Sequence, residues 1–389
     1  MRPFLLFFGL LLAFAIEILR VYFIMPFPGS QRSDTIEIAY FLNNNAIWLR
    51  IIALALVLPP LFYYFRKGRL WQKILLTLPI LLYVLIAYSF NFRFLADKMF
   101  YQPKEKLFAG GAADAIDSNK LIIGVALHGE ARAYPIEVIG YHHQVKDTVG
   151  GQPVMVTYCT VCRTGRVYSP FVNGRYTKFR LVGMDHFNAM FEDDSTESWW
   201  QQATGVAVTG PLKGQRLAEL PSAQMRLGDW MALHPDSRTL QPDPNFKAKY
   251  DSLKGYDEGL IDGSLERRDS GSWQFKSWVI GINLHGYSKA YDWNRLVKER
   301  LITDSVGHIP VLLTISPDNR SFYAYTPADS LHFRYDTASR LLKEDRTNSA
   351  WRVDGECVAG PLTGQRLPTV QAYQEFWHSW LTFHPATGR

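Results

Sequence analysis

The chain has 389 residues, which is enough for two or three domains that each bury a core of their own. A hydrophobic content of 47% and an aromatic content of 14% exclude a disordered protein. The formal charge of +6 is spread along the chain, and no basic face with interleaved aromatic residues predicts nucleic-acid binding. The three cysteines allow at most one disulfide bond within the chain.

Three apolar segments occupy the first hundred residues, at about 4–27, 47–65 and 75–92. Each has roughly the 20 residues that a helix needs to cross a bilayer. Glu17 and Arg20 in the first segment are spaced to share one helix face, where they can partly neutralise each other. We therefore predict an all-α transmembrane region of three helices over residues 1–95, with the lipid bilayer as its partner.

The alternative for the first segment is a cleaved signal peptide, because Ala13-Phe14-Ala15 resembles a small-residue cleavage site. The apolar run continues well beyond Ala15, which favours a membrane span. Cleavage would leave the orientation unchanged, since the second and third segments fix it alone.

The charges of the loops predict the orientation. Arg66, Lys67 and Arg69 lie between the second and third segments, whereas the first loop has one arginine against Asp34 and Glu37. Short loops rich in Lys and Arg stay in the cytoplasm. We therefore predict a multi-pass protein of the cell (inner) membrane whose chain after about residue 91 lies on the periplasmic or extracellular side.

The remaining chain contains an internal repeat. Residues 122–135 match residues 279–292 at an offset of 157, and residues 205–217 match residues 355–367 at an offset of 150. We predict a first repeat domain at 96–240, a polar linker at 241–276, and a second, degenerate repeat domain at 277–389.

Short apolar segments separated by turns dominate the first repeat. We predict strands at 121–127, 131–134, 153–158, 166–168 and 176–182, and helices at 135–141 and 223–233. The predicted fold class is therefore α+β and β-rich, with two tandem copies of one domain behind the all-α transmembrane region.

Cys159 and Cys162 close the apolar, β-branched strand predicted at 153–158. A turn at this point directs two sulfurs to one place. Such a pair can form a disulfide, hold a soft metal ion or perform thiol chemistry. The third cysteine, Cys357, lies in a predicted strand and is expected to be a small buried thiol.

The second repeat serves as an internal control, because residues that are lost from it together are expected to have formed one site. Both cysteines and three histidines are replaced in this way, by Ser316, Asn319, Glu299, Arg300 and Thr337. The candidate site residues are thus Cys159, Cys162, His142, His143 and His186.

These residues give the chain from about residue 100 onward a resemblance to the prokaryotic family called domain of unknown function 3179. The resemblance depends on the motifs 128–135 and 145–151, on His142 and on the Cys159–Cys162 pair, and it covers most of the first repeat. The family usually has Glu where this chain has His143. The resemblance implies a domain identity and no activity, substrate or cofactor.

Three functions compete on the sequence alone. The first is a soft-metal site for Cu or Zn, formed by the two cysteines with His142 and His186 or His143. The second is thiol/disulfide exchange, which the lack of a helix after Cys162 disfavours. The third is a structural disulfide in a module that binds a protein partner or a glycan at the outer face. Neither haem nor a nucleotide is expected, since Arg163 replaces the histidine of a haem attachment motif. Whether the protein is an enzyme is left open.

Overall fold

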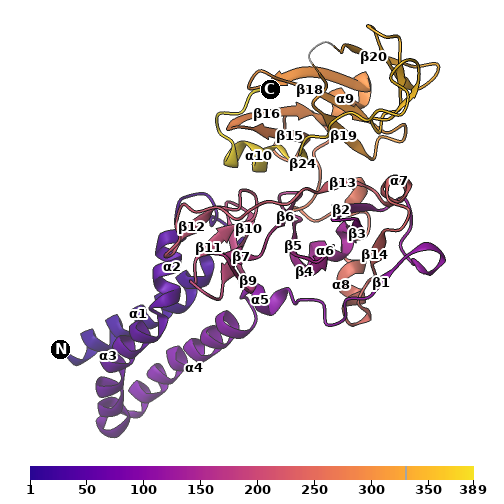
Figure 1. Ribbon diagram of the computed structural model, residues 1–389. Coiled ribbons are helices and arrows are strands. Elements are labelled where there is room, and N and C mark those ends of the chain that lie inside the picture. Colours follow the sequence, from indigo (N-terminus) through magenta and orange to yellow (C-terminus); the bar gives the residue numbers. More distant parts are fainter. Residues whose placement is uncertain (329–330) are drawn as a thin grey trace. The chain divides into compact units, whose positions relative to one another are not determined.

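The computed structural model describes residues 1–328 and 331–389, and it contains helices together with several small sheets (Figure 1). The mixed helix and strand content predicted from the sequence is confirmed. The chain forms two compact units. The first comprises Met1–Tyr101, Val172–Gln201 and Gly205–Arg216, and the second comprises Gln102–Phe171, Gln202–Thr204 and Leu217–Arg389.

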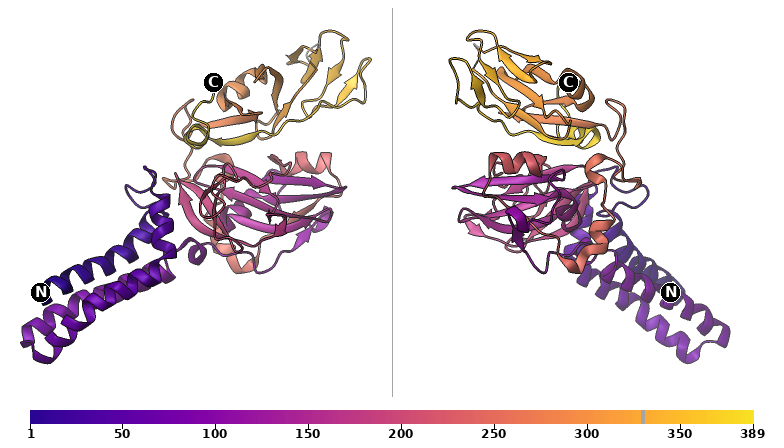
Figure 2. Two further views of the ribbon diagram at one scale, coloured as in Figure 1. Left: turned by 60° about the vertical axis from the view of Figure 1, so that its left-hand side comes forward. Right: turned by 90° about the vertical axis from the view of Figure 1, so that its right-hand side faces the viewer.

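The first unit begins with three helices that are long and apolar enough to cross a membrane, as predicted. They are α1 (Arg2–Tyr22), α3 (Ala46–Lys67) and α4 (Leu70–Phe92), and they lie side by side in both views of Figure 2. The shorter α2 (Ile36–Asn44) connects the first two, and α5 (Ala96–Met99) follows the third. Apolar side chains point outward from all three long helices, as expected for surfaces that face lipid.

The three long helices share one buried polar cluster. The carboxylate of Glu17 on α1 accepts hydrogen bonds from Arg50 of α3 at 2.6 Å and from Asn91 of α4 at 2.7 Å. Arg20 lies 3.9 Å from the same carboxylate and donates to Asn91 at 2.6 Å. The predicted pairing of Glu17 with Arg20 is thus one part of a larger cluster that ties the helices together.

The first unit also contains an antiparallel sheet in the order β12-β11-β10-β9. Its strands are β9 (Phe179–Asp185), β10 (Asn188–Asp193), β11 (Trp199–Gln201) and β12 (Ala207–Thr209). The Met184 amide donates to the Ile24 carbonyl just after α1, at 2.7 Å. Glu37 of α2 accepts a hydrogen bond from Thr209 at 2.8 Å. The sheet is therefore attached to the helices at the end where α1 finishes and α3 begins.

The second unit begins with a five-stranded sheet, in the order β1-β14-β3-β2-β13, and a three-stranded sheet, in the order β4-β5-β6. The strands are β1 (Phe108–Ala109), β2 (Leu121–Leu127), β3 (Glu130–Pro135), β4 (Gln144–Val149), β5 (Gln152–Cys159), β6 (Thr164–Tyr168), β13 (Ala223–Arg226) and β14 (Arg238–Leu240). The short pair β7 (Phe171–Val172) and β8 (Arg175–Tyr176) follows β6 in the chain, and the first unit begins again at Val172. The helices and 3-10 turns are η1 (Gly111–Ala113), α6 (Ile136–His142), α7 (Leu227–Leu233), η2 (Pro244–Phe246), α8 (Lys247–Asp251) and η3 (Tyr256–Glu258).

Three small sheets, in the orders β16-β15-β24, β17-β18-β19 and β20-β21-β22-β23, complete the second unit. The strands are β15 (Trp278–Leu284), β16 (Tyr287–Asp292), β17 (Leu301–Val306), β18 (Ile309–Ile315), β19 (Phe322–Tyr325), β20 (Phe333–Asp336), β21 (Leu341–Glu344), β22 (Ala350–Trp351), β23 (Cys357–Ala359) and β24 (Tyr373–Phe376). The helices are α9 (Trp293–Glu299) and α10 (Trp377–Phe383).

The elements of residues 121–168 and 278–325 follow the same order, which is two strands, a helix and three strands. The bounds of β2, β3, α6 and β4 recur in β15, β16, α9 and β17 at an offset of 157 residues. A strand followed by a helix recurs likewise, as β13 with α7 and as β24 with α10.

Two predicted elements differ from the structure. Residues 223–226 were expected to begin a helix, but they form β13, which pairs with β2 so that Ala223 faces Gly124. Pairing with a central strand outweighs the helical preference of this short segment, and the helix α7 begins only at Leu227. The strand predicted at 176–182 begins later, as β9 at Phe179.

Candidate thiol site

The strand β5 carries Cys159 at its end, and a turn through Cys162 returns the chain into β6. Cys159 pairs in register with Thr164, and Arg163 adopts a left-handed backbone conformation with φ of 56°. Both cysteine side chains are 0% exposed. The predicted strand, its turn and the returning strand are confirmed.

The thiol of Cys162 interacts with the thiol of Cys159 and with the hydroxyl of Ser379 on α10. Burial raises the pKa of the Cys162 thiol well above its usual value, and the neighbouring Cys159 adds to this increase. A proton on Cys162 is therefore held strongly at neutral pH, and Cys162 lacks the low thiol pKa of a reactive exchanger.

Backbone carbonyls of the turn are bound by residues that follow it by 90 to 220 positions in the chain. Tyr256 donates its hydroxyl to the Thr160 carbonyl at 2.8 Å, and the Phe376 amide donates to the Cys162 carbonyl at 3.0 Å. The Val161 carbonyl lies 3.3 Å from Nε2 of His378. The elements β24 and α10, together with the segment before β15, thus form a cover over the two thiols.

A lysine of this cover interacts with both sulfurs. The ammonium of Lys276 donates to the Val161 carbonyl at 3.4 Å and to the Leu265 carbonyl. Burial lowers the pKa of Lys276, and electrostatic interaction with Cys162 and Cys159 opposes that decrease. A positive charge beside the pair lowers the cost of a thiolate there.

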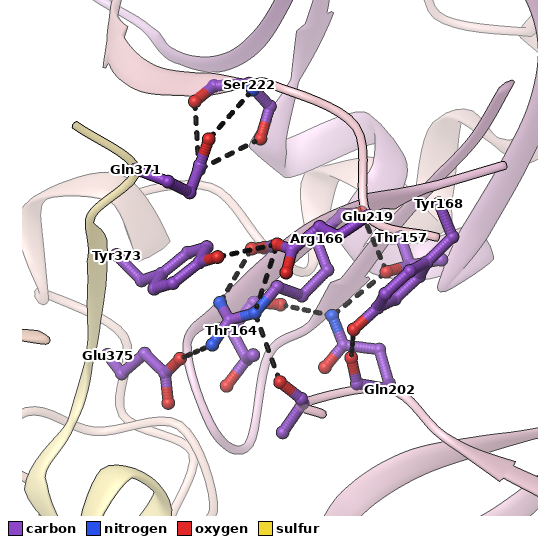
Figure 3. Close-up of polar contacts among 12 residues, drawn as sticks. Thr157, Thr164, Arg166, Tyr168, Gln202, Glu219, Ser222, Gln371, Tyr373 and Glu375 are labelled. Atoms are coloured by element: carbon purple, nitrogen blue, oxygen red, sulfur yellow. Dashed lines mark hydrogen bonds and ion pairs between the residues drawn. The ribbon is translucent and has the colours of Figure 1, made fainter. Parts of the chain in front are cut away.

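A buried arginine fixes β6 against the cover (Figure 3). The guanidinium of Arg166 donates to the Glu375 carboxylate, stacks on the Tyr373 ring with its central carbon 3.4 Å from the ring centre, and donates to the Ala203 carbonyl at 3.1 Å. Burial alone would lower the pKa of Arg166, but Glu375 raises it above its usual value. Glu375 also accepts from the Ser379 hydroxyl at 3.1 Å, which connects this ion pair to the thiol site.

His142 and His143 lie on the backbone neighbouring the cysteine strand, as the predicted antiparallel return requires. The His143 carbonyl accepts the Tyr158 amide at 3.0 Å, and β4 pairs with β5 from Gln144 onward. Nε2 of His142 lies 2.7 Å from the hydroxyl of Tyr250, and Nδ1 of His143 lies 3.2 Å from the Tyr141 carbonyl. Burial lowers the pKa of His143 to about 4. Both rings are buried, and each has a hydrogen-bond partner of its own.

The third candidate histidine belongs to the first compact unit. His186 follows β9, and its Nδ1 lies 2.7 Å from the Asp185 carboxylate, which raises the pKa of His186. Across residues 1–328 and 331–389, no three His, Cys, Asp or Glu side chains are grouped so that they could hold a metal ion. The structure thus brings the two cysteines together and gives the three histidines other partners.

Sequence reasoning missed the residues of the cover, namely Lys276, Glu375 and Ser379. Lys276 belongs to the segment 241–276, which has no counterpart in the matching stretches, so the sequence gives no signal for it. At an offset of 150 residues, Glu375 and Ser379 stand where Met225 and Asp229 stand earlier in the chain. A polar residue at a position that is apolar in the matching segment, as at Glu375, is a signal that the sequence does offer.

A family model described as a protein of unknown function, DUF3179, matches residues 106–387. The chain belongs to the DUF3179 family. No curated protein and no solved structure matches the chain. The family match covers the thiol site and its cover, and its description assigns no activity to either.

Proposed function

We propose that this DUF3179 member is a membrane-anchored protein of the outer face that holds one Cu(I) ion between Cys159 and Cys162. The observation that carries the proposal is the contact between two fully buried thiols beside a buried lysine. Soft thiolate ligands select Cu(I), and two sulfurs at one turn supply a linear pair of ligands.

The number of ligands favours Cu(I) over Zn(II). Structural zinc sites use four nitrogen, sulfur or oxygen ligands. His142 and His143 already engage Tyr250 and the Tyr141 carbonyl, and His186 engages Asp185. Cu(I) is satisfied by two sulfurs, so it needs none of the three histidines.

The charge of the site also favours this ion. Binding releases both thiol protons to solvent, so one Cu(I) with two thiolates carries a net charge of −1. The ammonium of Lys276 balances that charge in a buried place where an unpaired charge is costly. The metal replaces the protons that burial otherwise holds on the sulfurs, which makes affinity increase with pH.

A structural disulfide is the second candidate, and the contact between the sulfurs favours it as well. The outer face of the membrane is an oxidising compartment in which such a bond persists. Thiol/disulfide exchange is the weakest candidate, because both sulfurs are buried and the pKa of Cys162 is raised.

We also propose that residues 96–240 and 277–389 arose by duplication, with the linker at 241–276 between them. The matching residues and the recurring order of elements support this proposal. In this account the second copy lost the thiol site and gained Glu375 and Ser379, while the linker supplies Lys276. The cover is thus what the duplication contributes to function.

Copper binding to the full-length protein in detergent micelles tests the proposal. Reduced protein is titrated with Cu(I) against bicinchoninate as a competing chelator. We expect one Cu(I) per chain, and loss of this binding in both Cys159→Ser and Cys162→Ser. Cys357→Ser is the matched control, because Cys357 is 1% exposed and lies in β23, away from the turn.

A thiol count separates the two candidates. Protein purified without reductant is denatured and titrated with Ellman's reagent. Three thiols together with copper binding support the copper site. One thiol, rising to three after reduction, with no copper bound by the reduced protein, would replace the copper site by a structural disulfide.

A further inference from the structure

A cavity of about 930 Å³ lies within the first compact unit, at one end of the three long helices. Its wall is formed by the start of α1, the last part of α3 and the turn into α4, which lie together at the end marked N in Figure 1. Four residues of the wall are exposed, namely Arg2, Pro59, Tyr63 and Lys67. A molecule in the cavity can therefore reach their side chains.

The charged side chains at this end of the helices are all positive. Arg2 and Lys67 belong to the wall, and Arg66 and Arg69 lie close to Lys67 in the chain. Asp and Glu are absent from residues 1–16 and 38–96, and no acidic residue lines the cavity in this fully described part of the chain. The positive charge of the wall is thus left for an anion from outside the chain.

The two charges of the wall come from different helices. Arg2 begins α1 and Lys67 ends α3, so the packing of α1 against α3 brings them to one cavity. The guanidinium carbon of Arg2 lies 3.8 Å from the centre of the Tyr63 ring, which holds the arginine in place. An arginine stacked in this way keeps the N–H donors at its edge available, and their geometry suits a phosphate group.

The cavity also has an apolar side, which continues onto the outer surface of the helices. Leu5 and Pro59 belong to the wall, and the nearby side chains of Phe62 and Leu70 are exposed. Tyrosine and tryptophan are enriched at the depth of the lipid head groups, and Tyr63 with Trp71 marks that depth here. The ligand that fits this wall has an anionic part beside a long apolar part.

We propose that this cavity binds one anionic phospholipid, with phosphatidylglycerol as its simplest form. The phosphodiester accepts from Arg2 and Lys67, and the acyl chains lie along the apolar surface of α1 and α3. Basic pockets between membrane helices bind anionic head groups in this way. A free phosphate would satisfy the charges and leave the apolar side uncovered. The proposal rests on the membrane anchoring proposed above, and copper takes no part in it.

Native mass spectrometry of the full-length protein tests the site, in micelles that contain equal amounts of phosphatidylglycerol and phosphatidylcholine. Both lipids have a phosphodiester, but the choline ammonium neutralises it in the second. We expect one phosphatidylglycerol to be retained per chain, with a preference of at least about fivefold over phosphatidylcholine. Equal retention of the two lipids, or retention of neither, would overturn the proposal. Displacement of the lipid by millimolar glycerol phosphate, which lacks acyl chains, would assign the cavity to a soluble phosphate instead and overturn it as well.

Single substitutions separate a built site from the general attraction of anionic lipid to a basic loop. We expect Arg2→Gln and Lys67→Gln each to lower the retention of phosphatidylglycerol about fivefold. Arg69→Gln is the matched control, because it removes the same charge from the same exposed loop without changing the wall. It also keeps the backbone amide of residue 69, which donates to the Gln72 side chain at 2.8 Å. Equal losses in Arg69→Gln and Lys67→Gln, or wild-type retention in Arg2→Gln and Lys67→Gln, would overturn the proposal.

Carbonate washing of cell membranes separates this site from the anchoring on which it rests. We expect the full-length protein to stay in the membrane pellet, since carbonate releases proteins that are bound only at the surface. Release by carbonate would overturn the anchoring and the lipid site together. A protein that stays in the pellet and retains both lipids equally would overturn the lipid site alone.

Discussion

At the scale of single residues, the second unit is organised by charges that are buried with partners. Arg166 and Glu375 are both almost completely buried, with side chains 2% and 1% exposed, and each has a second polar partner. Removing charges from water is costly, and a buried pair recovers that cost only when both members are present. The ion pair between Arg166 and Glu375 therefore fixes the position of β24 against β6. Its net contribution to the free energy of unfolding is small, because the cost of removing both charges from water offsets their attraction.

The first prediction follows from this pairing. Arg166→Met leaves the Glu375 carboxylate buried without its ion pair, and we expect the free energy of unfolding to fall by about 3–5 kcal/mol. The double variant Arg166→Met with Glu375→Leu is expected to recover most of that loss, because no charge is left unpaired. Urea unfolding measures both.

A surface pair is the control for this prediction. Arg352 lies 2.7 Å from Asp354, and its side chain is 47% exposed. Arg352→Met is expected to cost less than about 1 kcal/mol. Equal losses in Arg166→Met and Arg352→Met would contradict the role of burial.

The second prediction concerns pH and Asp257. Burial raises the pKa of Asp257 to about 6 in the folded chain, above its value of 3.8 in a model compound. The folded chain therefore binds more protons than the unfolded chain between about pH 4 and pH 6, so stability is greatest below this window and decreases as pH rises through it. The decrease amounts to about 3 kcal/mol.

Asp257→Asn removes this dependence and keeps an acceptor for the Leu121 amide. We expect the variant to be more stable than the wild type near neutral pH, with a flatter profile between about pH 4 and pH 7. Thermal unfolding in micelles across this range measures the difference. Parallel profiles for the two proteins would exclude Asp257 as the source.

At the scale of elements, the sequence predicts a strand or helix correctly where its own residues form a strong pattern. It fails where the structure of a segment depends on a partner far away in the chain. The strand Leu121–Leu127 has the predicted bounds, because its continuous apolar run is buried and ends at a tight turn. The error at Ala223–Arg226 arose because its partner strand lies about one hundred residues earlier in the chain. The proximity of Cys159 and Cys162 was predictable, because they are three residues apart in the chain. Ser379 and Lys276 are more than 100 residues away, and only the folded chain brings them to the thiols.

The third prediction concerns close packing between a strand and a helix. A Cβ atom added at Gly124 in β2 would lie 2.5 Å from the ring of Trp230 in α7. The ring is 3% exposed and enclosed, so we expect Gly124→Ala to lower the free energy of unfolding by about 1–3 kcal/mol. A Cβ atom added at Gly281 would clash with the ring of Trp380 in the same way, and Gly281→Ala should have a similar effect.

Gly388→Ala is the control, because the added atom would meet its nearest neighbour at an ordinary 3.6 Å. We expect little change in the unfolding midpoint of this variant. A loss at Gly124 without a loss at Gly281 would count against equivalent packing in the two proposed copies.

At the scale of the whole molecule, the first unit has basic residues at one end of its three long apolar helices and a sheet at the other end. The basic residues Arg66, Lys67 and Arg69 join α3 to α4 at one end of the helices. The sheet is attached at the other end, through the contacts of Ile24 and Glu37. The sequence was sufficient to predict three long apolar helices here, because a run of about 20 apolar residues is the usual pattern of a helix long enough to cross a bilayer.

The last prediction is the orientation of these helices. Positively charged loops remain in the cytoplasm, so the loop at 66–69 is expected inside and the chain after α4 outside. Alkaline phosphatase, which folds only after export, should be active when fused after Arg389, and a reporter that works only in the cytoplasm should be silent there. Replacing Arg66, Lys67 and Arg69 by Gln should lower the phosphatase activity, whereas replacing the exposed Arg267 and Arg352 by Gln should not. A silent phosphatase and an active cytoplasmic reporter in the wild-type fusion would reverse the orientation, and with it the oxidising surroundings that we assign to the two thiols.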